Sequence, residues 1–285
     1  MAPPPANKPL TERLMLLVQT LQFAWFAGHV TLLLCTMRYG LSYITFNYYS
    51  SWARFSYRTA FLAAALTYGI VVYKGIRARA RSGQRQPGGN LALITDENIQ
   101  YLVMALIWLY SYQIPLALLP YTVYSVFHVA TYTRTNLIPT ITPPQGAAAT
   151  ATPDKNGAKP SSSPLADNIG RFVKQYYDAS MTLVAGLEIA LWLRLLLSAF
   201  SFAKGTWALL LVYTVFFRSR YSQSAFVQGA FHGVAARIDA LVANQSTPPQ
   251  ARQVWQTIKG LVGQATEFTD LRKYIGATPT PKKAQ

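Results

Sequence analysis

The sequence predicts an all-α membrane protein: a polytopic bundle of helices and hairpins, followed by a C-terminal pair of amphipathic helices at the membrane interface. Composition is the first observation, because 51% of the 285 residues are hydrophobic and only 13% are charged, whereas soluble domains carry about 25% charged residues. The second is that the apolar residues are gathered in long blocks. The third is that the tail carries apolar residues at helical spacing. Lipid is therefore the expected solvent for much of the chain.

Shifts in composition divide the chain into five expected regions. They are a disordered N-terminal tail (1–13), transmembrane helices and a hairpin (14–129), a loop with a disordered insert (130–180), a membrane helical hairpin (181–217) and a basic amphipathic cytosolic tail (218–285).

The first two apolar blocks are expected to form a helical hairpin. The block Leu14–Met37 would reach about 36 Å as one helix, enough to cross the hydrocarbon, and its length favours a retained signal-anchor over a cleaved signal. A tyrosine-rich connector leads to the second block, Phe55–Tyr73, where Arg58 is expected to extend toward the interface. The cations that follow between Lys74 and Arg85 include no acid, which predicts a cytosolic loop.

The third and fourth blocks each contain a break. In Ile99–Val129 the prolines Pro115 and Pro120 predict either a kinked helix or a shallow hairpin, because each proline removes a helical hydrogen bond. The residues just before this block resemble an N-cap and an acidic first turn. In Met181–Phe217 the pair Lys204–Gly205 predicts a hairpin in one leaflet. Each block was also compatible with a single crossing, so the number of crossings and the side of the 130–180 loop stay open.

Two apolar stripes at steps of three and four residues predict the amphipathic tail helices, 222–243 and 249–274. The expected membrane-binding residues are Val227, Phe231, Val234, Ile238, Leu241, Val254, Trp255, Ile258, Leu261, Phe268 and Leu271. Cations of the tail are expected to bind anionic lipid or an acidic protein, an importin-type receptor in particular: Arg218, Arg220, Arg237, Arg252, Lys259, Arg272, Lys273, Lys282 and Lys283. The alternative for the stripes is that the helices pack on each other or on the bundle as ordinary core.

The sequence offers little for catalysis. Its three histidines lie apart from any second ligand at metal-binding spacing, and it contains no phosphate loop and no nucleophile elbow. No catalytic residue, metal site or cofactor is predicted, and the net charge of +16 favours anionic lipid over nucleic acid. The ionisable residues Glu188 and Arg194, with His128, leave a second hypothesis open: a small-solute or ion transporter or a channel subunit. The simpler expectation for Glu188 and Arg194 is that their side chains extend to the interface at the hairpin ends or pair with another helix.

The stretch from Thr95 to Ile138 reads TDENIQYLVMALIWLYSYQIPLALLPYTVYSVFHVATYTRTNLI. It resembles the transmembrane protein 33 family, whose fungal members include a pore-membrane nucleoporin of the nuclear envelope. The residues that carry the resemblance are Asp96, Glu97, Asn98, Pro115, Pro120, His128, Arg134, Asn136 and Pro139. The order of the apolar blocks and the basic tail also match.

The resemblance implies a non-enzymatic protein of the endoplasmic reticulum membrane and the nuclear envelope, with several membrane passes and both termini in the cytosol. It implies a role in organising curved and tubular membrane and in assembling or distributing nuclear pore complexes. The partners it implies are the lipid bilayer, an importin-type transport receptor, nucleoporins and reticulon-like proteins.

Overall fold

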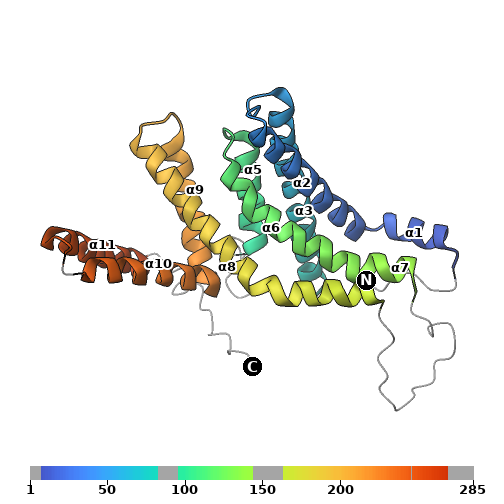
Figure 1. Cartoon of the computed structure of the whole chain (residues 1–285). Coiled ribbons are helices and arrows are strands. Elements are labelled where there is room, and N and C mark those ends of the chain that lie inside the picture. The colour runs from blue at the N-terminus through green and yellow to red at the C-terminus, as the bar shows by residue number, and fades with distance from the viewer. Residues whose placement is uncertain (1–7, 83–95, 144–162, 245, 269–285) are drawn as a thin grey trace, which may run out of the picture. The chain divides into compact units, whose positions relative to one another are not determined.

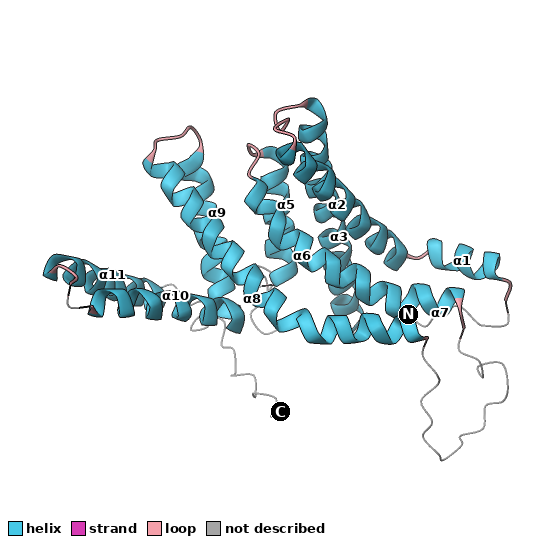
Figure 2. Cartoon of the chain, viewed as in Figure 1, coloured by secondary structure: helices cyan, strands magenta, loops and turns pink. Residues whose placement is uncertain are grey.

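A computed structural model describes residues 8–82, 96–143, 163–244 and 246–268, and this part of the chain is built from helices joined by short turns (Figure 2). The all-α prediction is confirmed. The chain divides into two compact units, one of Met1–Tyr73 with Tyr101–Val184 and one of Lys74–Gln100 with Ala185–Gln285. Figure 1 labels their helices.

The N-terminal apolar block is two helices, so the prediction of one continuous helix over Leu14–Met37 is wrong. Helix α1 (Leu10–Val18) meets α2 (Leu21–Ile44) at an angle of 80°. Thr20 makes the break favourable, because its side-chain oxygen accepts a hydrogen bond from the backbone N–H of Phe23 and so caps the new helix. Residues 10–13, expected to be disordered, belong to α1; residues 1–7 lie outside the described part.

Helix α3 (Ser51–Ser82) is longer than the second apolar block. It contains 32 residues, and the cations Lys74, Arg77, Arg79 and Arg81, expected in a loop, lie on its last turns. A basic C-terminal turn is favourable because the helix dipole places partial negative charge there.

The third block is a hairpin of α5 (Glu97–Tyr110) and α6 (Pro115–Tyr132) (Figure 1). Pro115 lies in the first turn of α6. Its missing backbone N–H costs little there, because the first N–H groups of a helix have no acceptor within the helix. The hydroxyl of Tyr121 donates to the carbonyl of Tyr101 at 2.9 Å, and Tyr101 also contacts Tyr124, as two antiparallel helices require. Of the two alternatives, the kinked helix is excluded.

Residues of α3 satisfy the backbone groups at this break. The hydroxyl of Tyr57 accepts from the backbone N–H of Ile114 at 3.1 Å, and Arg58 donates to the carbonyls of Trp108 and Leu109. Arg58 therefore caps the end of α5 instead of extending to the interface. Such partners are what make an interrupted helix tolerable in lipid.

The characteristic string that ends the resembling region forms a π-helix. Helix α6 passes into η1 (Thr133–Leu137) and then α7 (Ile138–Ile141). Pro139 lacks the N–H that would bond the carbonyl of Thr135, which favours a widened turn here. The 130–180 region is thus helical at both ends, since α8 begins at Pro164, while residues 144–162 lie outside the described part.

The second unit contains a hairpin of α8 (Pro164–Phe200), by its C-terminal half, and α9 (Thr206–Gln223). The turn between them places Gly205 at φ 77° and Phe202 at φ 53°, so the predicted break at Lys204–Gly205 is confirmed and glycine supplies the left-handed conformation. Trp192 of α8 donates to the hydroxyl of Thr214 on α9 at 3.0 Å. The tail follows as α10 (Ala225–Ala243) and α11 (Pro249–Phe268).

Two described helices are long and apolar enough to cross a membrane, Ser51–Arg81 and Pro164–Phe200, and the bent pair of α1 and α2 makes a third if it counts as one span. Helix α5, with 14 residues, is only about 21 Å long. The hairpin of α5 and α6 is therefore short for a hydrocarbon core of about 30 Å.

Candidate functional site

The two tail helices α10 and α11, here called the tail pair, are joined through the carboxylate of Asp239. Asp239 on α10 accepts a hydrogen bond of 2.6 Å from Nε1 of Trp255 and lies 3.0 Å from Nζ of Lys259, both on α11. Arg252 also donates to the carbonyl of Asn244 at 2.9 Å. The indole N–H and then the Lys259 ammonium hold the pKa of Asp239 below its ordinary value.

Most of the predicted stripe on α11 is exposed. Val254, Ile258 and Leu261 have exposed fractions of 57%, 44% and 60%, and water would surround these side chains if nothing covered them. Trp255, expected to insert into lipid, instead faces α10 through its bond to Asp239. The side chain of Phe268, and Leu271 altogether, lie outside the described residues.

The stripe on α10 changes character along the helix. Val227 is buried at 1% exposure, and the ring of Phe231 packs edge-on against Tyr221 of α9. Val234 and Leu241 are exposed, and Ile238 is half-buried. Val227 is therefore core, as the alternative interpretation predicts, whereas the stripe from Val234 onward offers an apolar surface.

The predicted cations of the tail have different surroundings. Arg237 and Arg252 are exposed, and Lys259 is exposed but pairs with Asp239. Arg218 donates to the carbonyl of Thr266 at 2.7 Å, which ties α9 to α11. Residues 269–285, which carry the four remaining cations, lie outside the described part.

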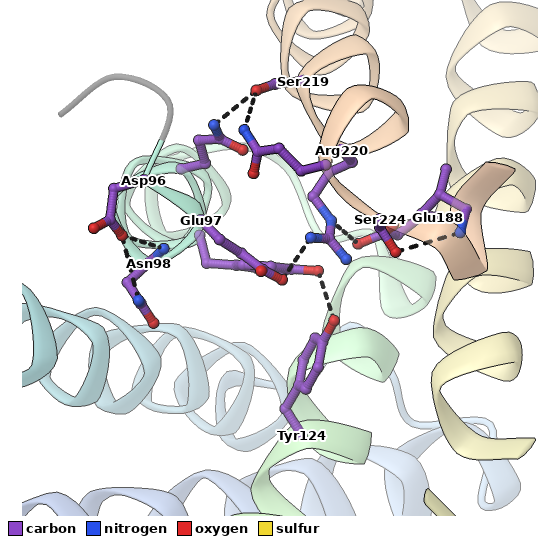
Figure 3. Close-up of polar contacts among 12 residues, drawn as sticks. Asp96, Glu97, Asn98, Tyr124, Glu188, Ser219, Arg220 and Ser224 are labelled. Atoms are coloured by element: carbon purple, nitrogen blue, oxygen red, sulfur yellow. Dashed lines mark hydrogen bonds and ion pairs between the residues drawn. The ribbon is translucent and has the colours of Figure 1, made fainter. Parts of the chain in front are cut away.

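Arg220 is the exception, and its assignment as a lipid- or importin-binding residue is wrong. Only 4% of its side chain is exposed. Its Nε lies 3.3 Å from Oε1 of Glu188, whose side chain is 1% exposed, and its Nη1 bonds Glu97 (Figure 3). A guanidinium held between two carboxylates inside the protein cannot reach a headgroup.

We call Glu97, Gln100, Glu188, Ser219 and Arg220 the Arg220 cluster. The amide of Gln100 donates to the hydroxyl of Ser219 at 2.7 Å. The cluster joins the first turn of α5, the middle of α8 and the end of α9. Buried charges require such partners, because each loses its hydration.

Glu188 is thus accounted for by pairing with another helix, the simpler of the two expectations for it. The hydroxyl of Tyr213 also donates to the Glu188 carbonyl at 3.2 Å. Arg194, by contrast, is exposed. The two ionisable residues of the transporter hypothesis have opposite surroundings, and Glu188 acts as a structural ion-pair partner.

The acidic start of α5 has two functions. Oδ1 of Asp96 accepts from the backbone N–H of Asn98 at 2.9 Å, which confirms the predicted cap. Oδ2 of Asp96 also pairs with Arg79 of α3 at 2.9 Å. Together with the bond between Glu97 and Arg220, these contacts join the Asp96-Glu97-Asn98 string to two other helices, α3 and α9.

Other residues that carry the family resemblance lie in the first unit and contribute to its packing. Pro120 is buried within α6, and Asn136 is buried in η1. Arg134 lies against α8 so closely that a Cβ added to Gly170 would come 2.8 Å from its Cζ. A larger side chain at position 170 would therefore displace the guanidinium of Arg134.

Two of the three histidines, His29 and His128, pack within the first unit. Nδ1 of His29 lies 2.9 Å from the hydroxyl of Ser125, and its ring centroid is 4.7 Å from that of His128. Trp25 packs against both rings. His232 is exposed. Within the described ranges, no group of three or more potential metal ligands gathers.

Sequence reasoning missed two features of this arrangement. The partner of Arg220 lies 32 positions away, and no local spacing relates residues that far apart. The bend at Thr20 did have a signal, because a threonine that precedes an apolar helix is a preferred N-cap.

The chain matches the family described as Transmembrane protein 33/Nucleoporin POM33 over residues 3–267. It is 57% identical over 288 residues to "Nucleoporin POM33" of Chaetomium thermophilum, with all of both chains covered. It is 33% identical to "Tetra-spanning protein 1" of Schizosaccharomyces pombe, covering 90% of this chain and 88% of the relative. Identity to "Pore membrane protein of 33 kDa" of Saccharomyces cerevisiae is 27%, over 98% and 94% of the two chains. No solved structure matches the chain.

Proposed function

The chain belongs to the transmembrane protein 33/nucleoporin POM33 family, a family of membrane nucleoporins that is not a known enzyme family, and from that premise we propose that it shapes and marks curved membrane at nuclear pores. Its residence would be the endoplasmic reticulum membrane and the pore membrane, with both termini in the cytosol. In this function it would organise tubular membrane and support the assembly or distribution of nuclear pore complexes.

The observation that carries the proposal is the exposed apolar surface of the tail pair. Its apolar residues are Val254, Ile258 and Leu261 on α11. The same two helices carry exposed cations, Arg237 on α10 and Arg252 on α11. An amphipathic helix with this combination binds by burying its apolar face at the headgroup boundary and by attraction to anionic lipid. Curved membrane exposes more of that boundary, so the tail would favour it.

The short hairpins add a second contribution to the same function. Helix α5 is too short to cross a bilayer of average thickness unaided. A hairpin that occupies one leaflet more than the other expands that leaflet and favours bending. We assign this role to the pair α5–α6, and to α8–α9 because α9 has 18 residues and reaches only about 27 Å.

The full-length protein in vesicles of mixed size tests the tail's role. We expect the protein density to be higher on small anionic vesicles than on large ones. Ile258→Glu should reduce that enrichment strongly, because burying an isoleucine contributes about 1.5–3 kcal/mol, or roughly ten- to hundredfold in partition. Gln256→Glu adds the same charge at an exposed polar position of α11 and should leave the enrichment unchanged. Equal wild-type density on small and large vesicles would exclude the proposal.

The same tail is our proposed docking segment for an importin-type receptor, with nucleoporins and reticulon-like proteins as further partners. Charge supports it, since the chain carries 26 basic against 10 acidic residues and acidic protein surfaces attract such a tail. Neutralising Arg237 and Arg252 together in the full chain should weaken receptor capture and reduce its sensitivity to salt. Unchanged capture by that double variant would remove these two arginines from the docking surface.

A further inference from the structure

Helix α1 has one inward face and one outward face. Arg13 and Leu17, one turn apart, have exposed fractions of 8% and 5%, and the helix packs against α7. The outward face carries exposed apolar side chains: Met15, Leu16 and Val18. A helix that buries an arginine and exposes leucine and methionine reverses the arrangement expected in water.

The guanidinium of Arg13 has no carboxylate partner among the described residues. Its Nε and Nη1 are buried and have no hydrogen-bond partner among the described residues. The adjacent acid, Glu12, is exposed and pairs with Lys8. An arginine stays protonated at any physiological pH, so the inner face of α1 holds a positive charge that needs an anion from outside the described chain.

We propose that the phosphate of a glycerophospholipid headgroup binds Arg13 between α1 and α7. The planar guanidinium offers parallel N–H groups that match phosphate oxygens in a bidentate pair. The exposed apolar face of α1 suits a helix lying in the interface, and its 80° angle to α2 directs it along the membrane plane where α2 crosses. Lipid phosphate is the anion that is abundant at that depth.

This site differs from the general attraction of the basic tail to anionic lipid. It requires the phosphate group and not a net negative charge, and it belongs to the first unit, whereas the tail belongs to the second. Its test is therefore independent of the vesicle-sorting experiment.

The purified full-length chain, stripped of lipid in detergent micelles, provides the test. A phosphatidylcholine is titrated while bound lipid is followed by native mass spectrometry and the melting temperature is recorded. Diacylglycerol with the same acyl chains controls for apolar contact, and inorganic phosphate controls for a free anion. We expect phosphatidylcholine to bind and to raise the melting temperature of the chain, and we expect neither diacylglycerol nor inorganic phosphate to do so. Arg13→Gln should weaken binding about tenfold or more, the effect of losing a charge-assisted hydrogen bond.

Arg171→Gln is the matched control, because Arg171 is exposed on α8 and bonds only its near neighbour Asn168 in the described residues; it should bind lipid as the wild type does. Arg13→Met supplies a second readout. Without lipid it should melt higher than the wild type, since it removes a buried unpaired charge, and phosphatidylcholine should then stabilise the wild type more than the variant.

Three outcomes would overturn the proposal. The first is equal phosphatidylcholine binding by Arg13→Gln and the wild type. The second is full stabilisation by inorganic phosphate, which would assign the site to a free anion. The third is an Arg13→Met variant that melts below the wild type without lipid, which would mean that the guanidinium already has an acceptor within the chain.

Discussion

Two carboxylates of the second unit, Glu188 and Asp239, are each held by a cation on another helix, yet their surroundings are opposite. Glu188 and Arg220 are almost wholly buried, with exposed side-chain fractions of 1% and 4%. Asp239 and Lys259 are 44% and 42% exposed. The first pair connects residues 32 positions apart across the α8–α9 hairpin, and the second connects consecutive tail helices.

The difference in burial indicates which of the two ion pairs is rigid and which can open. Separating a buried pair leaves charges without hydration, so the contact opens rarely. An exposed pair exchanges its partner for water at little cost. The Arg220 cluster is therefore expected to hold α5, α8 and α9 in place, whereas the contact between Asp239 and Lys259 can open without unfolding the unit.

The largest expected effect comes from breaking the buried pair. Arg220→Ala should lower the free energy of unfolding by about 3–5 kcal/mol, because it leaves Glu188 buried without its cation. Thermal unfolding of the full chain in detergent measures this. As a control, Arg220→Met combined with Glu188→Met should recover most of the loss, since the double variant buries no charge. A double variant as unstable as Arg220→Ala would show that packing, and not charge, dominates.

A smaller effect is expected at Glu97, the exposed carboxylate that also pairs with Arg220. Glu97→Gln should cost about 1 kcal/mol or less, because the Glu97 side chain is 48% exposed and glutamine still accepts a hydrogen bond. The same unfolding measurement compares it with Glu188→Gln. If the two glutamine variants were equally destabilised, burial would not be what distinguishes the two carboxylates.

The exposed tail pair should show a smaller effect on unfolding still. Asp239→Asn should leave the melting temperature of the whole chain nearly unchanged, but it should increase amide hydrogen exchange in α10 and α11, because the bonds to Trp255 and Lys259 weaken. High salt should produce part of this change in the wild type and none in the variant. Identical exchange in variant and wild type would mean that the carboxylate does not hold the helices together.

Acid should act on the tail only at low pH. Because the folded pKa of Asp239 is lowered, its contribution is fully present above the ordinary value of about 3.9 and is lost as the pH falls through the folded pKa. The indole N–H signal of Trp255, assigned by its absence in Trp255→Phe, should therefore stay constant from pH 7 to about pH 5. A change within that window would contradict the assigned contact.

Local chemistry in the sequence was enough for many elements. The hairpin turn at Gly205, the capped start of α5 at Asp96 and the break before Pro115 were predicted, because each depends on neighbours within a turn. The two tail helices followed from the spacing of their apolar residues. The single long helix over Leu14–Met37 failed because apolar length alone does not show a bend that one threonine caps.

The candidate sites were predicted less well, because burial depends on remote neighbours. Arg220 resembles Arg237 in the sequence, yet one is enclosed by carboxylates and the other is exposed. Val227 and Leu241 belong to one stripe, yet one is core and the other is surface. Helical spacing shows which residues share a face and leaves open what that face contacts.

The sequence by itself determined that this chain is a helical membrane protein, and it predicted a basic amphipathic pair in the tail, since composition and periodicity act over a few residues. Only the tertiary structure decided which charges are enclosed and which are available to a membrane. The physical reason is that the cost of a charge depends on its surroundings, and distant segments supply the surroundings of Arg13, Glu188 and Arg220.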